Sequence, residues 1–198
     1  KQEARKELGL DNDAGVILFV STLRPVKGAR YLIQAMKLLK GKNDGVTLVL
    51  IGDGDERQYL GNLAKELGLE KHVFFVGKVP NEKVPEYMAA SDIFALPSLS
   101  EGFPLVIAEA MAAGLPIVTT NIRGLPEIVQ DGENGFLVEP KKPRQIADKL
   151  QLLLENEELR AKMQRNNKEK AKGYSWERVI ENLEQVYSSV LHCNSEKI

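Results

Sequence analysis

The alternation of apolar and helical segments limits the possible folds of this chain more than any other feature. Short apolar runs recur along most of its length, each followed by residues with helical spacing. These runs are apolar throughout, so they predict strands buried on both faces, as in a parallel sheet between helices. The expected strands are 16–20, 47–51, 73–76, 93–96, 117–119 and 136–138.

The segments between these strands have apolar residues at the spacing of helix faces. Glycine or proline marks several of their ends, as at Gly68 and Gly114. The expected helices are 28–40, 56–67, 85–90, 104–113, a turn at 126–129, and then 146–154, 159–172 and 176–191. The pattern predicts an α/β fold: a doubly wound parallel sheet of about six strands with helices on both faces and a C-terminal helical extension.

Composition narrows the class of protein. The chain has 198 residues and a net charge of −1, which suits one domain and gives no electrostatic footprint for nucleic acid. No apolar run approaches the roughly 20 residues of a membrane span. Cys193 is the lone cysteine and cannot form an internal disulfide, which fits a reducing compartment. We expect a cytoplasmic protein, and the start at Lys1 suggests a fragment of a longer chain.

Ligands of doubly wound sheets bind at the carboxyl ends of the strands, so the loops there are the candidate sites. The loop 21–28 carries Arg24 and Lys27 just before a helix. Two cations beside a helix N-terminus suit a phosphate or diphosphate, and a solvated loop is the alternative. The loop has no Walker A pattern.

The loop after the second expected strand begins with Gly52-Asp53-Gly54. These are the first two glycines of a dinucleotide fingerprint, but the third position is Arg57. A tight turn is therefore the favoured interpretation, although the glycines would also let a ligand approach the backbone.

Two carboxylates, Glu101 and Glu109, flank an otherwise uncharged run. Glu109 falls in what reads as a buried helix, so we expect it to face a cleft or to bind hydroxyl groups. Their separation disfavours a glycosidase pair and favours contacts with two parts of one extended ligand. The alternatives are a helix-start charge for Glu101 and an ion pair for Glu109.

The residues around the helix start extend this candidate site. We expect the amides of Gly102, Phe103 and Leu105 to point toward an anion or a sugar oxygen, whereas Pro104 has no N–H to donate.

Metal and nucleophile chemistry have no support in the sequence. His72 and His192 have no cluster of ligands at metal spacing, so no metal is assigned. Ser98 and Ser100 have no nearby histidine that would make a nucleophile.

The run from Glu101 to Val118 resembles the E-x7-E signature of retaining glycosyltransferases of family 4, also called group 1. The supporting pieces occur in the family's order and extend the resemblance from about Leu8 to about Tyr187. They are Lys27-Gly28, Gly52-Asp53-Gly54, Phe75-Val76-Gly77, Ala90-Ser91-Asp92, Leu96-Pro97-Ser98, Leu125-Pro126-Glu127, 131–138 and Tyr174-Ser175-Trp176.

The resemblance implies a GT-B architecture, in which two Rossmann-like domains face each other across a cleft. Residues 1–198 would form the C-terminal domain, which binds the nucleotide-sugar donor. The missing N-terminal domain would bind the acceptor, and the helix at 175–191 would pack on it, which would explain the apolar stripe of that helix.

Roles carry over by position. Lys27 resembles the lysine on the donor diphosphate, Glu101 the glutamate on the transferred sugar, and Glu109 the glutamate on the ribose. Lys27, Glu101 and Arg24 form the expected catalytic set. The expected donor-binding set is Gly28, Gly52, Gly54, Gly77, Val79, Gly102, Phe103, Pro104, Leu105 and Glu109.

Two positions depart from the family. Ser21-Thr22-Leu23 stands where members usually have Gly-Arg-Leu, and the hypothesis is that Arg24 replaces the missing arginine on the diphosphate. Arg123 stands where the family tends to have a glycine, and it either adds a cation near the phosphates or points to solvent.

The implied reaction moves a sugar from a nucleotide donor, such as a UDP- or GDP-hexose, to an acceptor hydroxyl with retention of configuration and without a metal or other cofactor. The isolated chain is expected to be inactive, and a peripheral membrane role would depend on the missing half. The alternatives are an epimerase-like GT-B domain and a non-catalytic nucleotide-sugar-binding module. Response-regulator switches are disfavoured, since no acidic residues cluster at a strand end.

Overall fold

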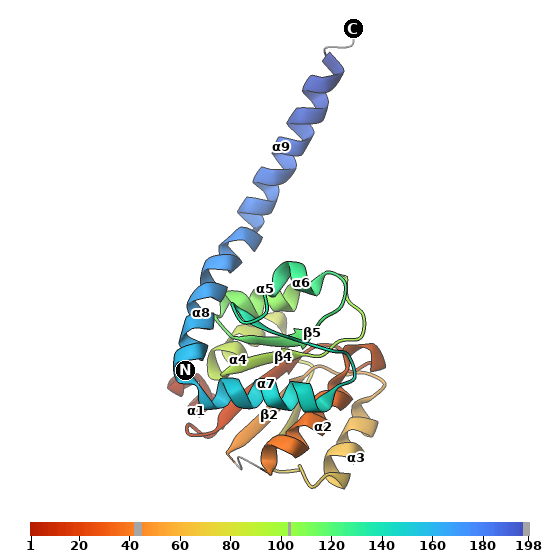
Figure 1. The fold of residues 1–198 in the computed structure, drawn as a ribbon, viewed down its shortest axis with the longest axis vertical. Coiled ribbons are helices and arrows are strands. Elements are labelled where there is room, and N and C mark those ends of the chain that lie inside the picture. The colour runs from red at the N-terminus through yellow and green to blue at the C-terminus, as the bar shows by residue number, and fades with distance from the viewer. Residues whose placement is uncertain (42–44, 103, 196–198) are drawn as a thin grey trace.

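The computed structural model describes residues 1–41, 45–102 and 104–195 and confirms the expected Rossmann-like α/β fold (Figure 1). Six strands form a parallel sheet in the order β3-β2-β1-β4-β5-β6. The order reverses direction between β1 and β4, which is where sheets of this kind bind ligands. The strands are β1 (Gly15–Val20), β2 (Val46–Ile51), β3 (Val73–Gly77), β4 (Ile93–Leu96), β5 (Ile117–Thr120) and β6 (Gly135–Val138).

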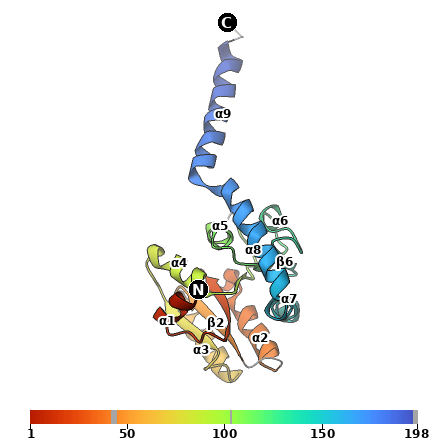
Figure 2. The same cartoon turned by 90° about the vertical axis from the view of Figure 1, so that its left-hand side faces the viewer.

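Helices cover both sides of the sheet. α2 packs against α7 on one side, and α1 packs against α4 on the other (Figure 2). The α-helices are α1 (Gln2–Glu7), α2 (Ala29–Lys40), α3 (Arg57–Glu66), α4 (Val84–Ala90), α5 (Leu105–Ala112), α6 (Leu125–Ile128), α7 (Pro143–Glu155), α8 (Glu157–Ala171) and α9 (Trp176–Ser195). Three 3₁₀ turns, η1 (Pro25–Lys27), η2 (Asn81–Lys83) and η3 (Lys172–Tyr174), complete the chain.

α1 is an element that the sequence pattern did not predict. Its anchor is Arg5, which is 3 % exposed and donates hydrogen bonds to the carbonyl of Ala90 at 2.8 Å and to Asp92 at 2.6 Å. The same guanidinium caps the carbonyls of Asn12 and Ala14 at 2.6 and 2.9 Å. A helix of this length is marginal by itself, so these tertiary contacts stabilise it.

The prediction that the strands are buried on both faces is wrong for β3. Phe74 and Val76 are 46 % and 38 % exposed, whereas Val73 is buried. β3 is an edge strand, and the chain leaves it through α4 to reach β4 in the middle of the sheet. One face of β3 therefore stays uncovered among the described residues.

A buried polar cluster ties α8 to the sheet. Asn167 donates to the carbonyls of Leu115 at 2.8 Å and Asn134 at 2.7 Å, and its own side-chain oxygen accepts from Asn134 at 2.9 Å. Asn134 also accepts from the backbone of Gln130, which shapes the turn before β6. The 131–138 motif therefore has a structural role in this fold.

α9 extends away from the domain (Figures 1 and 2). Its apolar stripe is open to solvent, with Val179, Ile180, Leu183, Val186 and Tyr187 between 37 % and 67 % exposed. The side chains of Trp176, Val190 and Leu191 belong to the expected stripe but lie outside the described part. No helix among the described residues is long and apolar enough to span a bilayer.

Candidate functional site

The loops after β1, β4 and β5 meet at the carboxyl edge of the sheet. Gly28 adopts a φ of 71°, and an added Cβ there would lie 1.9 Å from the carbonyl oxygen of Pro97. The amide of Leu99 donates to the carbonyl of Val26 at 2.7 Å, so η1 and the loop after β4 are joined directly. The loop after β5 touches the same place, because a Cβ on Gly124 would lie 2.9 Å from the carbonyl of Gly102.

The glycines after β2 are explained by contacts within the chain. A Cβ on Gly52 would lie 1.9 Å from the carbonyl of Ser21, and one on Gly54 would lie 2.6 Å from that of Leu23. This supports the tight-turn interpretation. Gly77 and Gly102 differ, because an added Cβ at either meets nothing within 4 Å. Close packing within the described residues therefore does not explain these two glycines.

The structure brings Lys27 and Glu101 together. The Lys27 ammonium lies 2.9 and 2.8 Å from the two carboxylate oxygens of Glu101. The Glu101 side chain is only 6 % exposed, and that of Lys27 is 23 % exposed. Two residues that lie far apart in the sequence therefore form one charged pair at the junction of the loops.

The N-terminus of α5 lies next to this pair along the chain. Pro104 is its N-cap residue and makes no side-chain cap, and the helix begins at Leu105. Among the described residues, the amides of Leu105 and Val106 have no acceptor. Free amides at a helix start carry a partial positive charge, so this end can bind an anion. Phe103, expected here as a donor contact, lies outside the described residues.

Glu109 is exposed, so the interpretation of α5 as a buried helix is wrong for this face. Ile107, Ala110 and Met111 are buried, whereas Leu105, one turn before Glu109, is 61 % exposed. The reason is that α5 packs on α8 and β5 through one face only. Glu109 forms no ion pair among the described residues, so the expected alternative of a structural ion pair is not seen.

Glu109 lines a cavity of about 360 Å³ between α5 and the start of α9. Apolar groups dominate the rest of the wall, among them Ala108, Ala112 and Val179. Tyr174 also lines it, and burial raises the pKa of its phenol, with a further contribution from the negative charge of Glu127. The expectation that Glu109 faces a cleft is therefore met.

Three further residues named from the sequence, Arg24, Arg123 and Val79, are exposed or half-buried. Arg24 is exposed and is the N-cap residue of η1, the turn that ends at Lys27. Its guanidinium has no ion pair among the described residues, and Arg123 is exposed as well. Val79 is half-buried in the loop after β3.

Sequence reasoning placed Ser98 in the Leu96-Pro97-Ser98 piece of the resemblance and rejected it as a nucleophile, but missed its contact with Glu101. Ser98 is fully buried, and its hydroxyl donates to Glu101 at 2.5 Å. Thr120, at the end of β5, in turn donates to the carbonyl of Ser98 at 2.5 Å. The one available signal was the three-residue spacing between Ser98 and Glu101.

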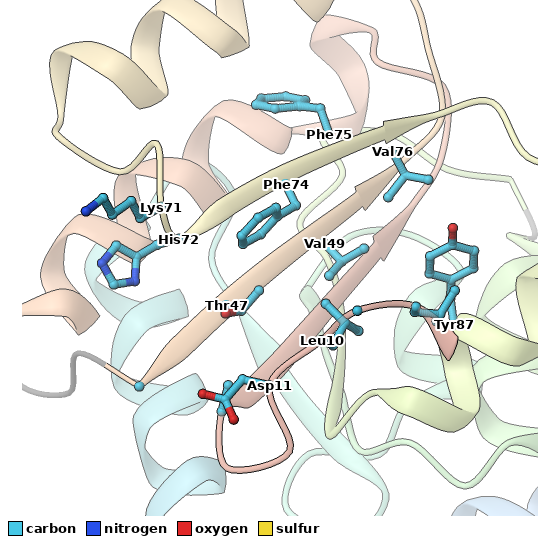
Figure 3. A pocket seen from close by; sticks show the side chains of 14 residues that line it. Leu10, Asp11, Thr47, Val49, Lys71, His72, Phe74, Phe75, Val76 and Tyr87 are labelled. Atoms are coloured by element: carbon cyan, nitrogen blue, oxygen red, sulfur yellow. The ribbon is translucent and has the colours of Figure 1, made fainter. Parts of the chain in front are cut away.

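A second hollow has different chemistry. A groove of about 610 Å³ lies over the open face of β2 and β3, lined by Leu10, Val49, Phe74, Val76 and Tyr87 among others (Figure 3). It shares no lining residue with the Lys27–Glu101 pair or with Glu109. The Nδ1 atom of His72, at its edge, lies 3.1 Å from the carbonyl of Val46. In the described part of the chain, no three His, Cys, Asp or Glu side chains gather as a metal site would require.

Comparison with known proteins agrees with this arrangement. The family model described as "Glycosyl transferases group 1" matches residues 1–170. D-inositol 3-phosphate glycosyltransferase of Corynebacterium efficiens is 37 % identical over 193 residues, covering 94 % of this chain and 46 % of its own. N-acetyl-alpha-D-glucosaminyl L-malate synthase of Bacillus anthracis is 34 % identical, covering 96 % and 49 %. The chain thus spans about half the length of the curated relatives it matches.

Solved structures give the same result. HepE of Anabaena in complex with UDP superposes with a TM-score of 0.86 at 31 % identity, over 95 % of this chain and 52 % of its own. The C-terminal domain of a group 1 glycosyl transferase family protein, LpcC of Francisella tularensis, superposes with a TM-score of 0.78 at 33 % identity, over 86 % and 90 %. The matched region is therefore a unit that has been crystallised by itself in a relative.

Proposed function

This chain belongs to the group 1 glycosyltransferases, and on that premise we propose that it is the donor-binding half of a retaining glycosyltransferase. The donor would be a nucleoside-diphosphate hexose, and the acceptor would offer a hydroxyl group. The observation that carries the proposal is the Lys27–Glu101 pair, held where the loops after β1 and β4 meet.

The proposed chemistry follows from the charges that develop in the reaction. Transfer leaves negative charge on the departing diphosphate, and groups already aimed at that charge lower the barrier. Lys27 and the free amides at the start of α5 would supply this stabilisation, and Arg24 would add a second cation. These groups need no metal. Glu101 would hold hydroxyls of the transferred sugar.

Glu109 has the geometry for a second contact with the donor. It lies on the exposed face of α5, one turn beyond Leu105 at the helix start. A carboxylate can accept two hydrogen bonds from vicinal hydroxyls, which is how ribose is commonly held. The open backbones of Gly77 and Gly102 would complete the donor site, together with Val79.

We also propose that the chain needs a second domain for transfer. The curated relatives are about twice as long, and the apolar stripe of α9 is exposed. An acceptor-binding domain packed on α9 would account for both observations. By itself the chain would bind a nucleotide sugar without transferring it.

The relatives favour a uridine nucleotide as the first probe, because structures of HepE contain UDP or UDP-glucose. Titration calorimetry with UDP-glucose and with a GDP-hexose tests binding to the chain. Lys27→Met should weaken the affinity about tenfold or more, since a charge-assisted contact contributes roughly 1.5–3 kcal/mol.

Lys37→Met is the matched control, because Lys37 is an exposed lysine in the last turn of α2, the helix that follows Lys27. Its affinity should stay within about twofold of the wild type, as is usual for an exposed charge remote from a ligand. Equal affinities of the two variants, or transfer of the sugar by this chain alone, would contradict the proposal.

A further inference from the structure

We propose that Ser98 is a positioning residue for Glu101 and thereby for the hold on the transferred sugar. The inference rests on the proposed function, because it assumes that Glu101 contacts that sugar. It concerns a side chain that would not touch the donor itself, since Ser98 is fully buried.

The contacts around Glu101 carry the inference. The Ser98 hydroxyl donates to Oε1 of Glu101 at 2.5 Å, and Lys27 reaches both Oε1 and Oε2, at 2.9 and 2.8 Å. Among the described residues, Oε1 therefore has two donors and Oε2 has one. A hydrogen bond to an ionised acceptor is about twice as strong as a neutral one, so the Ser98 contact fixes the orientation of the carboxylate.

The backbone at Ser98 is itself held by hydrogen bonds from β5 and to η1. Thr120, fully buried at the end of β5, donates to the carbonyl of Ser98 at 2.5 Å. The next residue, Leu99, donates its amide to Val26 in η1 at 2.7 Å. The backbone that carries Ser98 is thus tied to β5 on one side and to the turn that bears Lys27 on the other.

The two partners of Glu101 differ in what a donor would do to them. A bound diphosphate would compete for the Lys27 ammonium, because phosphate oxygens attract it as a carboxylate does. Ser98 lies out of the donor's reach and would keep its bond. In the bound state, Ser98 is then the partner that holds Oε1 and leaves Oε2 for a sugar hydroxyl.

The test compares two affinities for each variant: that for a nucleoside diphosphate and that for its hexose conjugate. The wild-type chain is titrated with UDP, GDP and ADP and their hexose conjugates, and the pair that binds is used throughout. The dissociation constant of the bare nucleotide divided by that of its hexose conjugate isolates the contribution of the sugar, and this quotient is the ratio used below. Glu101→Gln defines the loss expected when the sugar contact itself is weakened.

Ser98→Ala should reduce the sugar's contribution about tenfold, although Glu101 is intact, and should change the affinity for the bare nucleotide less than about threefold. Ser98→Thr, which keeps the hydroxyl, should restore the ratio. Thr120→Val, which releases the Ser98 carbonyl, should lower the ratio by a smaller factor, and it serves as the second route if Ser98→Ala fails to fold.

Thr119→Val is the matched control. Thr119 is equally buried on β5 and donates its hydroxyl to the carbonyl of Leu96 at 2.7 Å, away from Glu101. It should lower the melting temperature as Ser98→Ala does, but leave the ratio unchanged. That difference separates positioning from a general loss of stability.

Each outcome decides between the claims. A normal ratio in Ser98→Ala or in Thr120→Val, or an equal loss in Thr119→Val, overturns the role of Ser98 while the proposed function stands. A normal ratio in Glu101→Gln overturns the proposed sugar contact. A wild-type chain that binds none of the nucleotides overturns the proposed function, and this inference with it.

Discussion

Two glycines at the carboxyl edge of the sheet are required by the packing of the chain against itself. Gly28 and Gly52 approach the carbonyls of Pro97 and Ser21 so closely that no side chain fits. Both are donor-binding candidates from the sequence, Gly52 because glycine would let a ligand approach the backbone, and Gly28 through the family resemblance. The structure adds that the neighbour they approach is the chain's own backbone, which no pattern of residues reveals.

Gly28→Ala should therefore lower the free energy of unfolding by about 3 kcal/mol or more, because it combines left-handed strain with a clash against the backbone. Gly68→Ala is the matched control, since Gly68 has a φ of 66° and open space around it. That variant should lose only about 1–2 kcal/mol, the cost of the left-handed conformation alone. Denaturant titration measures both, and equal losses would contradict the assigned clash.

How much of the site was predictable also shows at the scale of residues. The sequence identifies Lys27 as a cation between a strand and a helix, and Glu101 as a carboxylate that flanks an uncharged run. It does not identify Ser98 as the partner of Glu101, since the partner of a hydroxyl depends on how two loops close around it. The exposure of Glu109 was missed because α5 consists almost wholly of apolar residues, and composition does not say which face is covered.

At the scale of elements, α8 is held by polar contacts that its apolar periodicity does not predict. The helix was predicted at 159–172 from its periodicity, close to the observed Glu157–Ala171. Its buried anchor, however, is an asparagine whose partners lie in the segments before β5 and β6. α1 escaped prediction for a similar reason, since its anchor is a buried arginine. Apolar periodicity therefore located α8 without revealing its polar anchor, and it missed α1, which is fixed by a polar side chain.

Asn167→Ala should lower the free energy of unfolding by about 3 kcal/mol, because it leaves several buried polar groups without a partner. Asn166→Ala is the matched control, because Asn166 is the neighbour of Asn167 and donates to the carbonyl of Glu133 at 2.7 Å near the surface. That change should cost less than about 1 kcal/mol. Thermal and denaturant unfolding of the two variants check the difference, and similar losses would refute the assigned anchor.

On the scale of the whole molecule, α9 lies outside the hydrophobic core that stabilises the rest of the domain. The core lies between the sheet and helices α2 to α8, whereas the main contact of α9 is with η3. Large exposed apolar surfaces usually mark a place where another surface packs. The doubly wound domain was predictable because its strands and helices alternate in order, while the direction of α9 was not, because its apolar stripe stays exposed.

A chain that ends at Ser175 should accordingly keep its stability within about 1 kcal/mol, since little buried area is lost. It should also self-associate less in analytical ultracentrifugation, because the apolar stripe is gone. A chain that ends at Asn156 is the control and should unfold, since it also loses the buried Met163 and Asn167. Substantial destabilisation by the shorter deletion would contradict the independence of α9.

The bend before α9 gives the molecule a mechanical property. Ser175 has extended backbone geometry, with a φ of −66° and a ψ of 150°, and separates η3 from a straight helix of 20 residues. Such a helix is about 30 Å long, so a turn of about 10° at Ser175 would displace its tip by roughly 5 Å. A change in one pair of dihedral angles at Ser175 would thus be amplified into a displacement of several ångströms at the end of the helix.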